Sequence, residues 1–295
     1  MSFAVSAVEF LRKTLAYPDW RGRALYGLCR GVFALVPIRR RLMLDALKTS
    51  FPEKDEAWRK KTLRGVYRHF SWMIVEFLAC QNDPSLVSKM VVEVEGRECA
   101  DAQKASGAGC FMLTGHFGNW EILGGWLPQN GYPVQPAARD ADNPEFAALI
   151  ERYRANLGET TLRKGAMNVR HMIRQAQAGT WVALLADQDA GDRAVPVTFL
   201  NRRTTMVEGP AALALTAKLP LLTVYSLRLA PFKYRVVFLP DLVGDPQERS
   251  RENIAALTQK ANAVLEEMVR LAPEQWFWFH RRWKTDPDHP GVKMQ

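Results

Sequence analysis

The residues of this sequence best suited to chemistry are His116 and Glu121, in the run Gly115-His116-Phe117-Gly118-Asn119-Trp120-Glu121. An imidazole can accept a proton near neutral pH, and a nearby carboxylate can fix which ring nitrogen carries the hydrogen. A histidine and a glutamate at this spacing are often unrelated surface residues. The local setting of the pair must therefore decide between a surface pair and a proton-transfer site.

That setting favours proton transfer. An apolar run from Cys110 to Leu113 precedes the histidine and predicts a buried strand, and a second run, Ile122 to Leu127, predicts the start of a helix. Gly118 and Asn119 allow the sharp turn that joins a strand to a helix. Ligands of open α/β sheets bind outside the carboxyl ends of the strands. We therefore expect His116 to face a substrate.

The elements that must position this motif alternate after residue 90. Apolar runs predict strands at Val91–Val94, Cys110–Thr114, Pro133–Ala137, Trp181–Ala186, Leu221–Leu229 and Tyr234–Leu239. Helical patterns separate them at Ile122–Gln129, Pro144–Leu157, Asn168–Ala178 and Val207–Ala217, and a last helix is predicted at Ser250–Leu271. Such alternation predicts an α/β domain over residues 91–295, with a mostly parallel central sheet flanked by helices. The short link between the last two strands predicts an antiparallel hairpin.

The first 90 residues carry helical patterns only, and they predict an amino-terminal helical layer with one long helix from Glu53 to Cys80. Within this layer the stretch from Ala24 to Val36 is amphipathic, with aromatic and arginine residues nearby. It is too short for a membrane span and carries Arg30. The pattern fits a helix lying in a membrane interface, and equally a helix that packs on the core with a solvated basic side.

The net charge of +9 calls for an anionic partner, and nucleic acid, acidic lipid and acidic protein all qualify. The four cysteines form no CxxC pair, and no other metal-ligand spacing is present, so we expect neither a metal nor a cofactor. There is no GxSxG elbow and no Walker lysine motif. The absence of these motifs argues against a serine hydrolase of the α/β class and against a P-loop nucleotide-binding protein.

Further polar residues follow predicted strands and are candidates for binding substrate. Arg139 comes just after one strand and is either an anion contact in the cleft or a surface ion pair. Asp187 and Gln188 come just after another and are either part of a cleft rim or a helix cap. The backbone N–H groups of Gly118 and Asn119, or Arg139, are the candidates for stabilising an oxyanion.

The segment Pro273–Lys284 interleaves aromatic rings with cations. Such a pattern suits single-stranded nucleic acid, a membrane interface, or core packing of the rings beside a solvated basic edge. A basic nucleic-acid-binding protein is therefore an alternative to an enzyme. No RNP, KH or helix-turn-helix signature supports it, so we do not expect nucleic acid as a partner.

Taken together, these segments resemble the bacterial lipid A biosynthesis acyltransferases, the lauroyl and myristoyl late acyltransferases. The matching segments are Leu35-Val36-Pro37, Ser50–Glu53, Gly115–Glu121, Arg139, Asp142-Asn143-Pro144, Asp187–Asp189, Pro196–Leu200 and Pro273–Lys284. Each is weak alone, and their order makes the resemblance specific.

The resemblance implies a glycerolipid-acyltransferase-like fold and an enzyme at the cytoplasmic face of the cell inner membrane. Such enzymes move a fatty acyl chain from acyl carrier protein, with coenzyme A as the alternative donor, to a hydroxyl of a lipid A precursor. Their signature is a histidine followed after four residues by an acidic residue, which His116 and Glu121 match. The Gly118-Asn119-Trp120 spelling also occurs in relatives that acylate other polar lipids, so another polar lipid, a glycophospholipid or an aminolipid, is the alternative acceptor.

Overall fold

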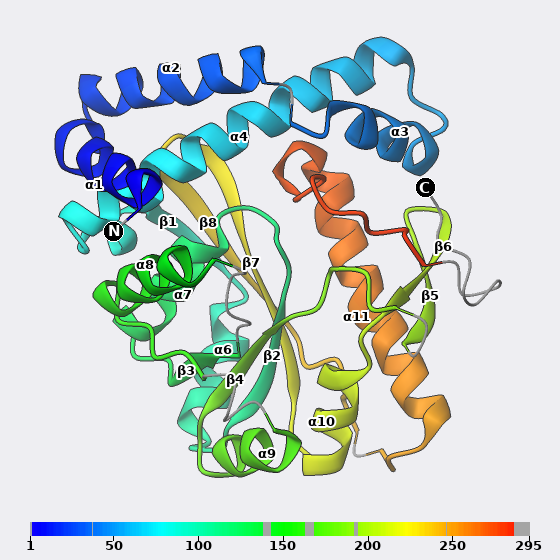
Figure 1. Cartoon of the computed structure of the whole chain (residues 1–295). Helices are drawn as coiled ribbons and strands as arrows, with labels where there is room; N and C mark the ends of the chain where they lie inside the picture. The colour runs from blue at the N-terminus through cyan, green and yellow to red at the C-terminus, as the bar shows by residue number, and fades with distance from the viewer. Residues whose placement is uncertain are drawn as a thin grey trace.

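The computed structural model describes residues 2–36, 38–137, 143–162, 168–191, 194–245 and 247–285, and its centre is a six-stranded sheet (Figure 1). The strands are β1 (Val91–Glu95), β2 (Cys110–Thr114), β3 (Val134–Pro136), β4 (Trp181–Leu185), β5 (Val195–Phe199), β6 (Arg202–Met206), β7 (Leu221–Ala230) and β8 (Lys233–Leu239). The helices are α1 (Phe3–Leu15), α2 (Trp20–Leu35), α3 (Arg40–Ser50), α4 (Glu56–Asn82), α5 (Leu86–Met90), α6 (Arg97–Ala105), α7 (Trp120–Gln129), α8 (Pro144–Asn156), α9 (Val169–Gln177), α10 (Gly209–Ala217), α11 (Arg251–Leu271) and the short η2 (Pro273–Gln275).

The sheet has the order β1-β8-β7-β2-β4-β3, and four of its five neighbouring pairs are parallel. The exception is the β7–β8 hairpin, which is antiparallel as predicted. The mostly parallel α/β fold is therefore confirmed. Because β2, β4 and β7 run in the same direction, their carboxyl ends meet at one edge of the sheet.

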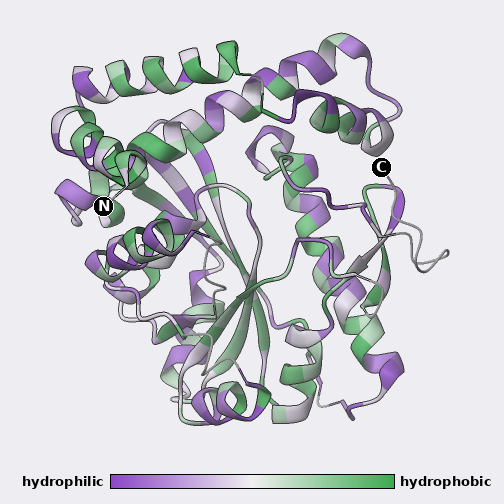
Figure 2. Ribbon diagram, in the orientation of Figure 1, coloured by the Kyte–Doolittle hydropathy of each residue, from purple (hydrophilic) through white to green (hydrophobic). Residues whose placement is uncertain are grey.

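Strand β2 shows how helices cover both faces of the sheet. Cys110 and Met112 point into a hydrophobic cluster that includes residues of α7. Phe111 and Leu113 point into another cluster, with residues of α9, α10 and α11. All five residues of β2 are buried. This is the continuous apolar pattern that a central parallel strand requires, and Figure 2 shows the same hydrophobic character along the neighbouring strands.

The sequence patterns missed the hairpin of β5 and β6, which forms a separate two-stranded sheet. Burial alternates along β5, and the strand packs on α11 rather than joining the main sheet. The residues of β5 pair with those of β6, for example Val197 with Thr204, and β5 contains no long apolar run. A five-residue strand that contains a proline carries little local signal of its own.

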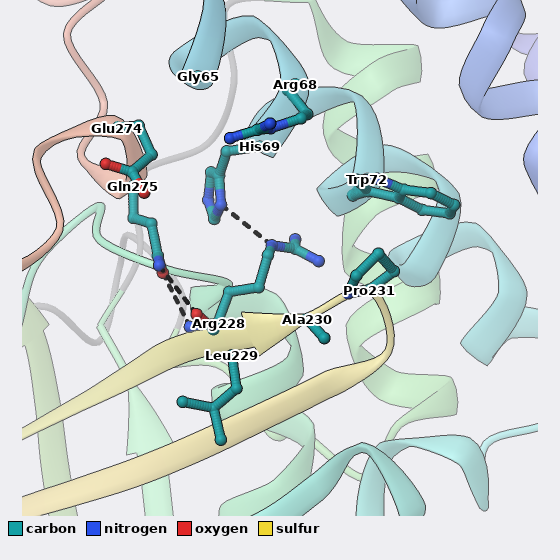
Figure 3. Close-up of a pocket in the computed structure, with 10 residues that line it drawn as sticks. All are labelled: Gly65, Arg68, His69, Trp72, Arg228, Leu229, Ala230, Pro231, Glu274 and Gln275. Atoms are coloured by element: carbon teal, nitrogen blue, oxygen red, sulfur yellow. Dashed lines mark hydrogen bonds between the residues drawn. The ribbon is translucent and has the colours of Figure 1, made fainter. Parts of the chain in front are cut away.

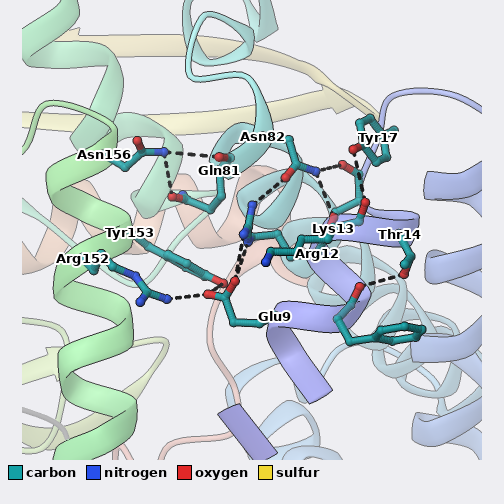
Figure 4. A network of polar contacts seen from close by, with 12 residues as sticks. Glu9, Arg12, Lys13, Thr14, Tyr17, Gln81, Asn82, Arg152, Tyr153 and Asn156 are labelled. Atoms are coloured by element: carbon teal, nitrogen blue, oxygen red, sulfur yellow. Dashed lines mark hydrogen bonds and ion pairs between the residues drawn. The ribbon is translucent and has the colours of Figure 1, made fainter. Parts of the chain in front are cut away.

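Polar contacts tie the amino-terminal helices to the sheet domain (Figure 4). Glu9 of α1 accepts hydrogen bonds from Arg152 (2.5 Å) and Tyr153 (2.8 Å) of α8. Arg12 of α1 binds Glu9 and also donates to Asn82 at the end of α4 (2.6 Å). Helix α1 is thus anchored to the helix that, as described below, supplies a cation to the candidate site.

The exposed apolar side chains gather on the amino-terminal helices. Those of α1, α2 and the link that follows α2 are Phe3, Phe10, Trp20, Leu28, Val32, Leu35, Val36 and Ile38, here called the amino-terminal apolar surface. Arg39, Arg40 and Arg41 are exposed next to it in the sequence. Among the helices of the described ranges, none is both long enough and apolar enough to cross a bilayer.

Candidate active site

His116 lies directly after β2, and its partner lies directly after the neighbouring strand β4. The two strands pair in parallel from Cys110 opposite Trp181 to Thr114 opposite Leu185, a constant offset of 71 residues. Continuing the same register beyond the strands brings Asp187 opposite His116. Accordingly, the Nδ1 atom of His116 lies 2.7 Å from Oδ1 of Asp187.

The Asp187 carboxylate is held as an acceptor from three directions. Its Oδ2 atom accepts hydrogen bonds from the backbone N–H of His116 (2.8 Å) and the indole N–H of Trp276 (3.0 Å). Burial alone would raise the pKa of Asp187, but the charge and hydrogen bonds of His116 and the bond from Trp276 lower it to about 2. This low pKa favours the carboxylate form of Asp187 near neutral pH. The carboxylate accepts from Nδ1–H, which leaves Nε2 on the other side of the ring as the base.

The imidazole is poised as a proton acceptor. Burial lowers the pKa of His116, but the charge and hydrogen bond of Asp187, followed by the charge of Glu121, raise it overall above its usual 6.5. The ring also packs edge-on against Trp120, with centroids 4.9 Å apart. A histidine with a buried carboxylate at one nitrogen and a cavity beside it is the arrangement of a general base.

Glu121 occupies a different place from the one the sequence suggested. Its carboxylate forms a two-pronged ion pair with Arg154 of α8, at 2.8 Å (Nε to Oε2) and 2.6 Å (Nη2 to Oε1), and also accepts from the indole of Trp120. The expectation that Glu121 fixes the tautomer of His116 is wrong, because Asp187 makes that hydrogen bond. Glu121 acts on the imidazole through its charge. Its assignment as a catalytic residue stays a prediction.

We expect Glu121→Gln to retain more activity than a change at Asp187 and to move the acid limb of the pH–activity profile to lower pH. Loss of the negative charge, with the charge of Arg154 left unopposed, lowers the pKa of His116, so the base stays neutral at more acidic pH. The measurement is kcat/KM against pH. Glu93→Gln, which breaks an exposed ion pair with Arg235, is the control and should leave the profile unchanged. An unmoved profile for Glu121→Gln would contradict this role.

The turn after His116 is locked by contacts on its far side. Gly118 has a φ of +60°, its N–H donates to the carbonyl of Gln275 (3.0 Å), and the N–H of Asn119 donates to the Ser226 hydroxyl (2.9 Å). The Asn119 side chain caps α7 by accepting from the N–H of Ile122. Both N–H groups are thus committed to protein acceptors, which does not fit the oxyanion contact expected of them. Their assignment as substrate-binding residues stays a prediction.

Gly118→Ala should destabilise the fold and remove activity. A Cβ at this position would lie 1.5 Å from the carbonyl oxygen of Ser226, and the left-handed backbone adds about 1–3 kcal/mol of strain. The matched control is Gly107→Ala, where φ is +69° but nothing lies within 4 Å of the new Cβ. Thermal unfolding should show a clearly larger loss for Gly118→Ala. Equal losses in the two variants would show that the close approach to Ser226 does not matter.

A cavity of about 430 Å³ opens beside His116. Most of its walls are apolar, formed by residues such as Met112, Leu123, Leu127 and Val224, and such walls suit a hydrocarbon chain. Its polar lining residues include Thr114, His116, Glu121, Arg154, Glu159, Gln188 and Asp189. Gln188, predicted to bind substrate, is exposed on this lining. Asp187 is buried behind His116 and is not part of the lining, so its predicted direct contact with substrate does not fit the structure.

A second carboxyl group, that of Glu159, is buried in the same cavity. Burial, and next the charge of Glu121, raise its pKa well above its ordinary value, although Arg154 opposes this. Oε1 of Glu159 has no hydrogen-bond partner among the described residues. The side chain fits against Gly124, where a Cβ would come within 2.7 Å of the carboxyl group. Glu159 thus adds to the cavity a buried carboxyl group whose raised pKa favours its neutral form.

The carboxyl-terminal aromatic segment packs inside the protein. Trp276, Trp278 and Trp283 are less than a tenth exposed and belong to one hydrophobic cluster, and Arg282 is fully buried. The N–H of Phe277 donates to the carbonyl of His116 (2.9 Å), which ties this segment to the turn that carries His116. Buried rings cannot stack on bases, so the nucleic-acid interpretation of this segment is wrong and the core-packing one is confirmed. Arg139 and Asp142 lie outside the described residues.

Comparison with known proteins places this geometry in context. Residues 3–285 match the family model described as bacterial lipid A biosynthesis acyltransferase. The lipid A biosynthesis palmitoleoyltransferase of Escherichia coli K12 is 26% identical over 244 residues, which are 82% of this chain and 77% of that protein. The lauroyltransferase of the same organism is 25% identical over 266 residues, covering 89% of this chain and 84% of that protein. A phosphatidylinositol mannoside acyltransferase of Mycobacterium tuberculosis CDC 1551 is 25% identical over 222 residues, which are 73% of this chain and 67% of that protein.

Proposed function

The chain belongs to the bacterial lipid A biosynthesis acyltransferases, and from that premise we propose that it transfers a fatty acyl group from acyl carrier protein to a hydroxyl of a lipid A precursor. The observation that carries the proposal is the His116–Asp187 pair, with His116 on the lining of a largely apolar cavity. A cavity of this kind can hold the acyl chain while the histidine meets the acceptor hydroxyl.

The proposed reaction is a direct transfer. Nε2 of His116 takes the proton of the acceptor hydroxyl as that oxygen attacks the thioester carbonyl. The tetrahedral intermediate collapses to an ester, and the proton passes from the imidazolium to the departing thiolate. Asp187 holds the ring in the productive tautomer and stabilises the imidazolium between these steps. A thioester is already activated, so this chemistry needs no metal, cofactor or acyl-enzyme intermediate.

The donor and the acceptor are tested together. Purified protein is incubated with labelled acyl-acyl carrier protein or labelled acyl-coenzyme A, and with a lipid A precursor or a glycophospholipid as acceptor. Mass spectrometry then identifies the acylated product. We expect the carrier-protein donor and the lipid A precursor to give the faster reaction, since two of the relatives are named for lipid A. If the glycophospholipid alone is acylated, the acceptor is not a lipid A precursor but a lipid of the class named for the phosphatidylinositol mannoside acyltransferase.

We also place the enzyme at the cytoplasmic face of the cell inner membrane, attached by the amino-terminal apolar surface. Its exposed rings and aliphatic side chains can enter a lipid interface, and Arg39, Arg40 and Arg41 can bind anionic head groups. The fraction of protein that sediments with phosphatidylglycerol vesicles should fall as the salt concentration rises. The double variant Leu35→Ser and Trp20→Ser should bind less at every salt concentration. Binding unaffected by both changes would remove this surface from the model of attachment.

A further inference from the structure

A second cavity, of about 370 Å³, lies between α4 and the turn of the β7–β8 hairpin (Figure 3). It shares no lining residue with the cavity beside His116. Its lining residues are Gly65, Arg68, His69, Trp72, Arg228, Leu229, Ala230, Pro231, Glu274 and Gln275. No step of the proposed acyl transfer uses one of these side chains.

Arg228 lines this cavity, and one of its donors is unsatisfied. Its side chain is only 9% exposed, with Nη1 paired to Glu76 and Nε donating to Nδ1 of His69 (3.1 Å). Nη2 has no hydrogen-bond partner among the described residues, although the atom is buried. Leaving a charged donor buried without an acceptor is costly, so the vacant position is one that an acceptor from a ligand can fill.

The surrounding contacts prevent the protein from filling that position itself. The Glu76 carboxylate already accepts from the N–H of Phe232 (2.7 Å) and the hydroxyl of Tyr234 (2.5 Å). Because Arg228 can only donate, Nδ1 of His69 is an acceptor, so Nε2 carries the hydrogen and donates to the carbonyl of Gly118 (3.0 Å). Burial, and then the charge of Arg228, hold the pKa of His69 well below its usual value, which keeps the ring neutral in this role.

The rest of the cavity defines what could bind there. Arg68 supplies a second, exposed guanidinium, and Trp72, Leu229 and Pro231 supply apolar wall. Glu274 is the carboxylate among the lining residues, while Glu76, which does not line the cavity, is paired with Arg228. Guanidinium groups suit phosphate, and the apolar wall leaves room for an organic group attached to it.

We propose that this cavity binds the phosphate group of a phosphate ester, with Nη2 of Arg228 and the guanidinium of Arg68 as donors. The position of the cavity favours the head group of a membrane phospholipid over a soluble ester. Trp72 stacks on Tyr26 of α2, with centroids 4.3 Å apart, and α2 carries much of the amino-terminal apolar surface. Leu229 and Ile74 are also exposed in the elements that border the cavity. Head groups would therefore be presented at its rim.

Calorimetric titration at constant ionic strength tests the site in the full chain, with inorganic phosphate, glycerol 3-phosphate and dihexanoyl phosphatidic acid as probes. Arg68→Gln should weaken binding about tenfold or more, the usual loss for a hydrogen bond to a charged group. Arg64→Gln is the matched control, because Arg64 is exposed on the same helix and does not line the cavity. Glu274→Gln should strengthen binding, since it removes the opposing charge.

Arg228 is tested in the double variant Arg228→Met and Glu76→Gln, because removing the arginine alone would leave a buried carboxylate without its partner. Binding should be lost in the double variant and kept in His116→Ala, which separates this site from the proposed transfer reaction. Tighter binding of the lipid than of glycerol 3-phosphate identifies the head group as the source, and equal binding identifies a soluble ester. The proposal is overturned if none of the probes binds, or if binding is the same in Arg68→Gln and the double variant as in the wild type.

Discussion

Replacing His116 with alanine is expected to lower acyl transfer by about 10²–10⁴-fold, the usual contribution of a positioned general base. The hydroxyl of the acceptor would then have to lose its proton to water while it attacks. The apolar walls of the cavity are unchanged by this substitution, so the effect should appear in kcat rather than in KM. The measurement is the steady-state rate with the donor and acceptor that the product analysis identifies.

Alanine at position 116 also leaves Asp187 without the partner that holds its pKa low. A second variant, His116→Asn, keeps a side-chain N–H that can donate toward Asp187 and still lacks a base. Both variants should show this loss of activity, and His116→Asn should unfold closer to the wild-type temperature. His171→Ala, on α9 and outside the cavity lining, is the control and should retain full activity. Wild-type rates in either His116 variant would end the proposed mechanism.

Asp187→Asn is expected to cause a loss of the same order, about 10²–10⁴-fold, although the residue does not line the cavity. The amide oxygen of asparagine can still accept from the N–H of His116 and from Trp276, which turns its NH₂ group toward Nδ1 of the imidazole. Nδ1 must then accept, and the hydrogen moves to Nε2. A ring with its hydrogen on Nε2 cannot take the proton of the hydroxyl.

The pH dependence separates this effect from general damage to the loop. Because Asp187 is the main group that raises the pKa of His116 against the effect of burial, its neutralisation should move the acid limb of the remaining activity to lower pH. The comparison is Asp189→Asn, since Asp189 follows two residues later and holds Thr285 through two hydrogen bonds. Asp189→Asn should cost less activity and leave the limb in place. Equal losses and unshifted profiles in the two variants would mean that the loop, and not the tautomer, had been disturbed.

Local patterns predicted much of the frame correctly. The six strands of the main sheet were each predicted within a few residues, because their apolar runs and flanking turn residues record burial directly. In the structure, the side chains of Asn119 and Asn143 cap α7 and α8 by accepting from backbone N–H groups. The β5–β6 hairpin was not predicted, because its two strands are stabilised by pairing with each other and by packing on α11.

Local patterns do not predict the order of the strands in the sheet, nor the contacts that this order creates. Glu121 is near His116 in the sequence, but the first turn of α7 carries it to Arg154, 33 residues further along the chain. Asp187 is 71 residues away, and the parallel pairing of β2 with β4 brings it to the imidazole. The cavity beside Arg228 likewise joins α4 to a hairpin more than a hundred residues later.

The residue types and the strand–turn–helix setting were enough to predict His116 as a base and to place it at the end of a buried strand. Which acid serves it was decided by the tertiary structure alone. Strand pairing depends on the free energy of the whole packed sheet, and no short stretch of sequence contains that information.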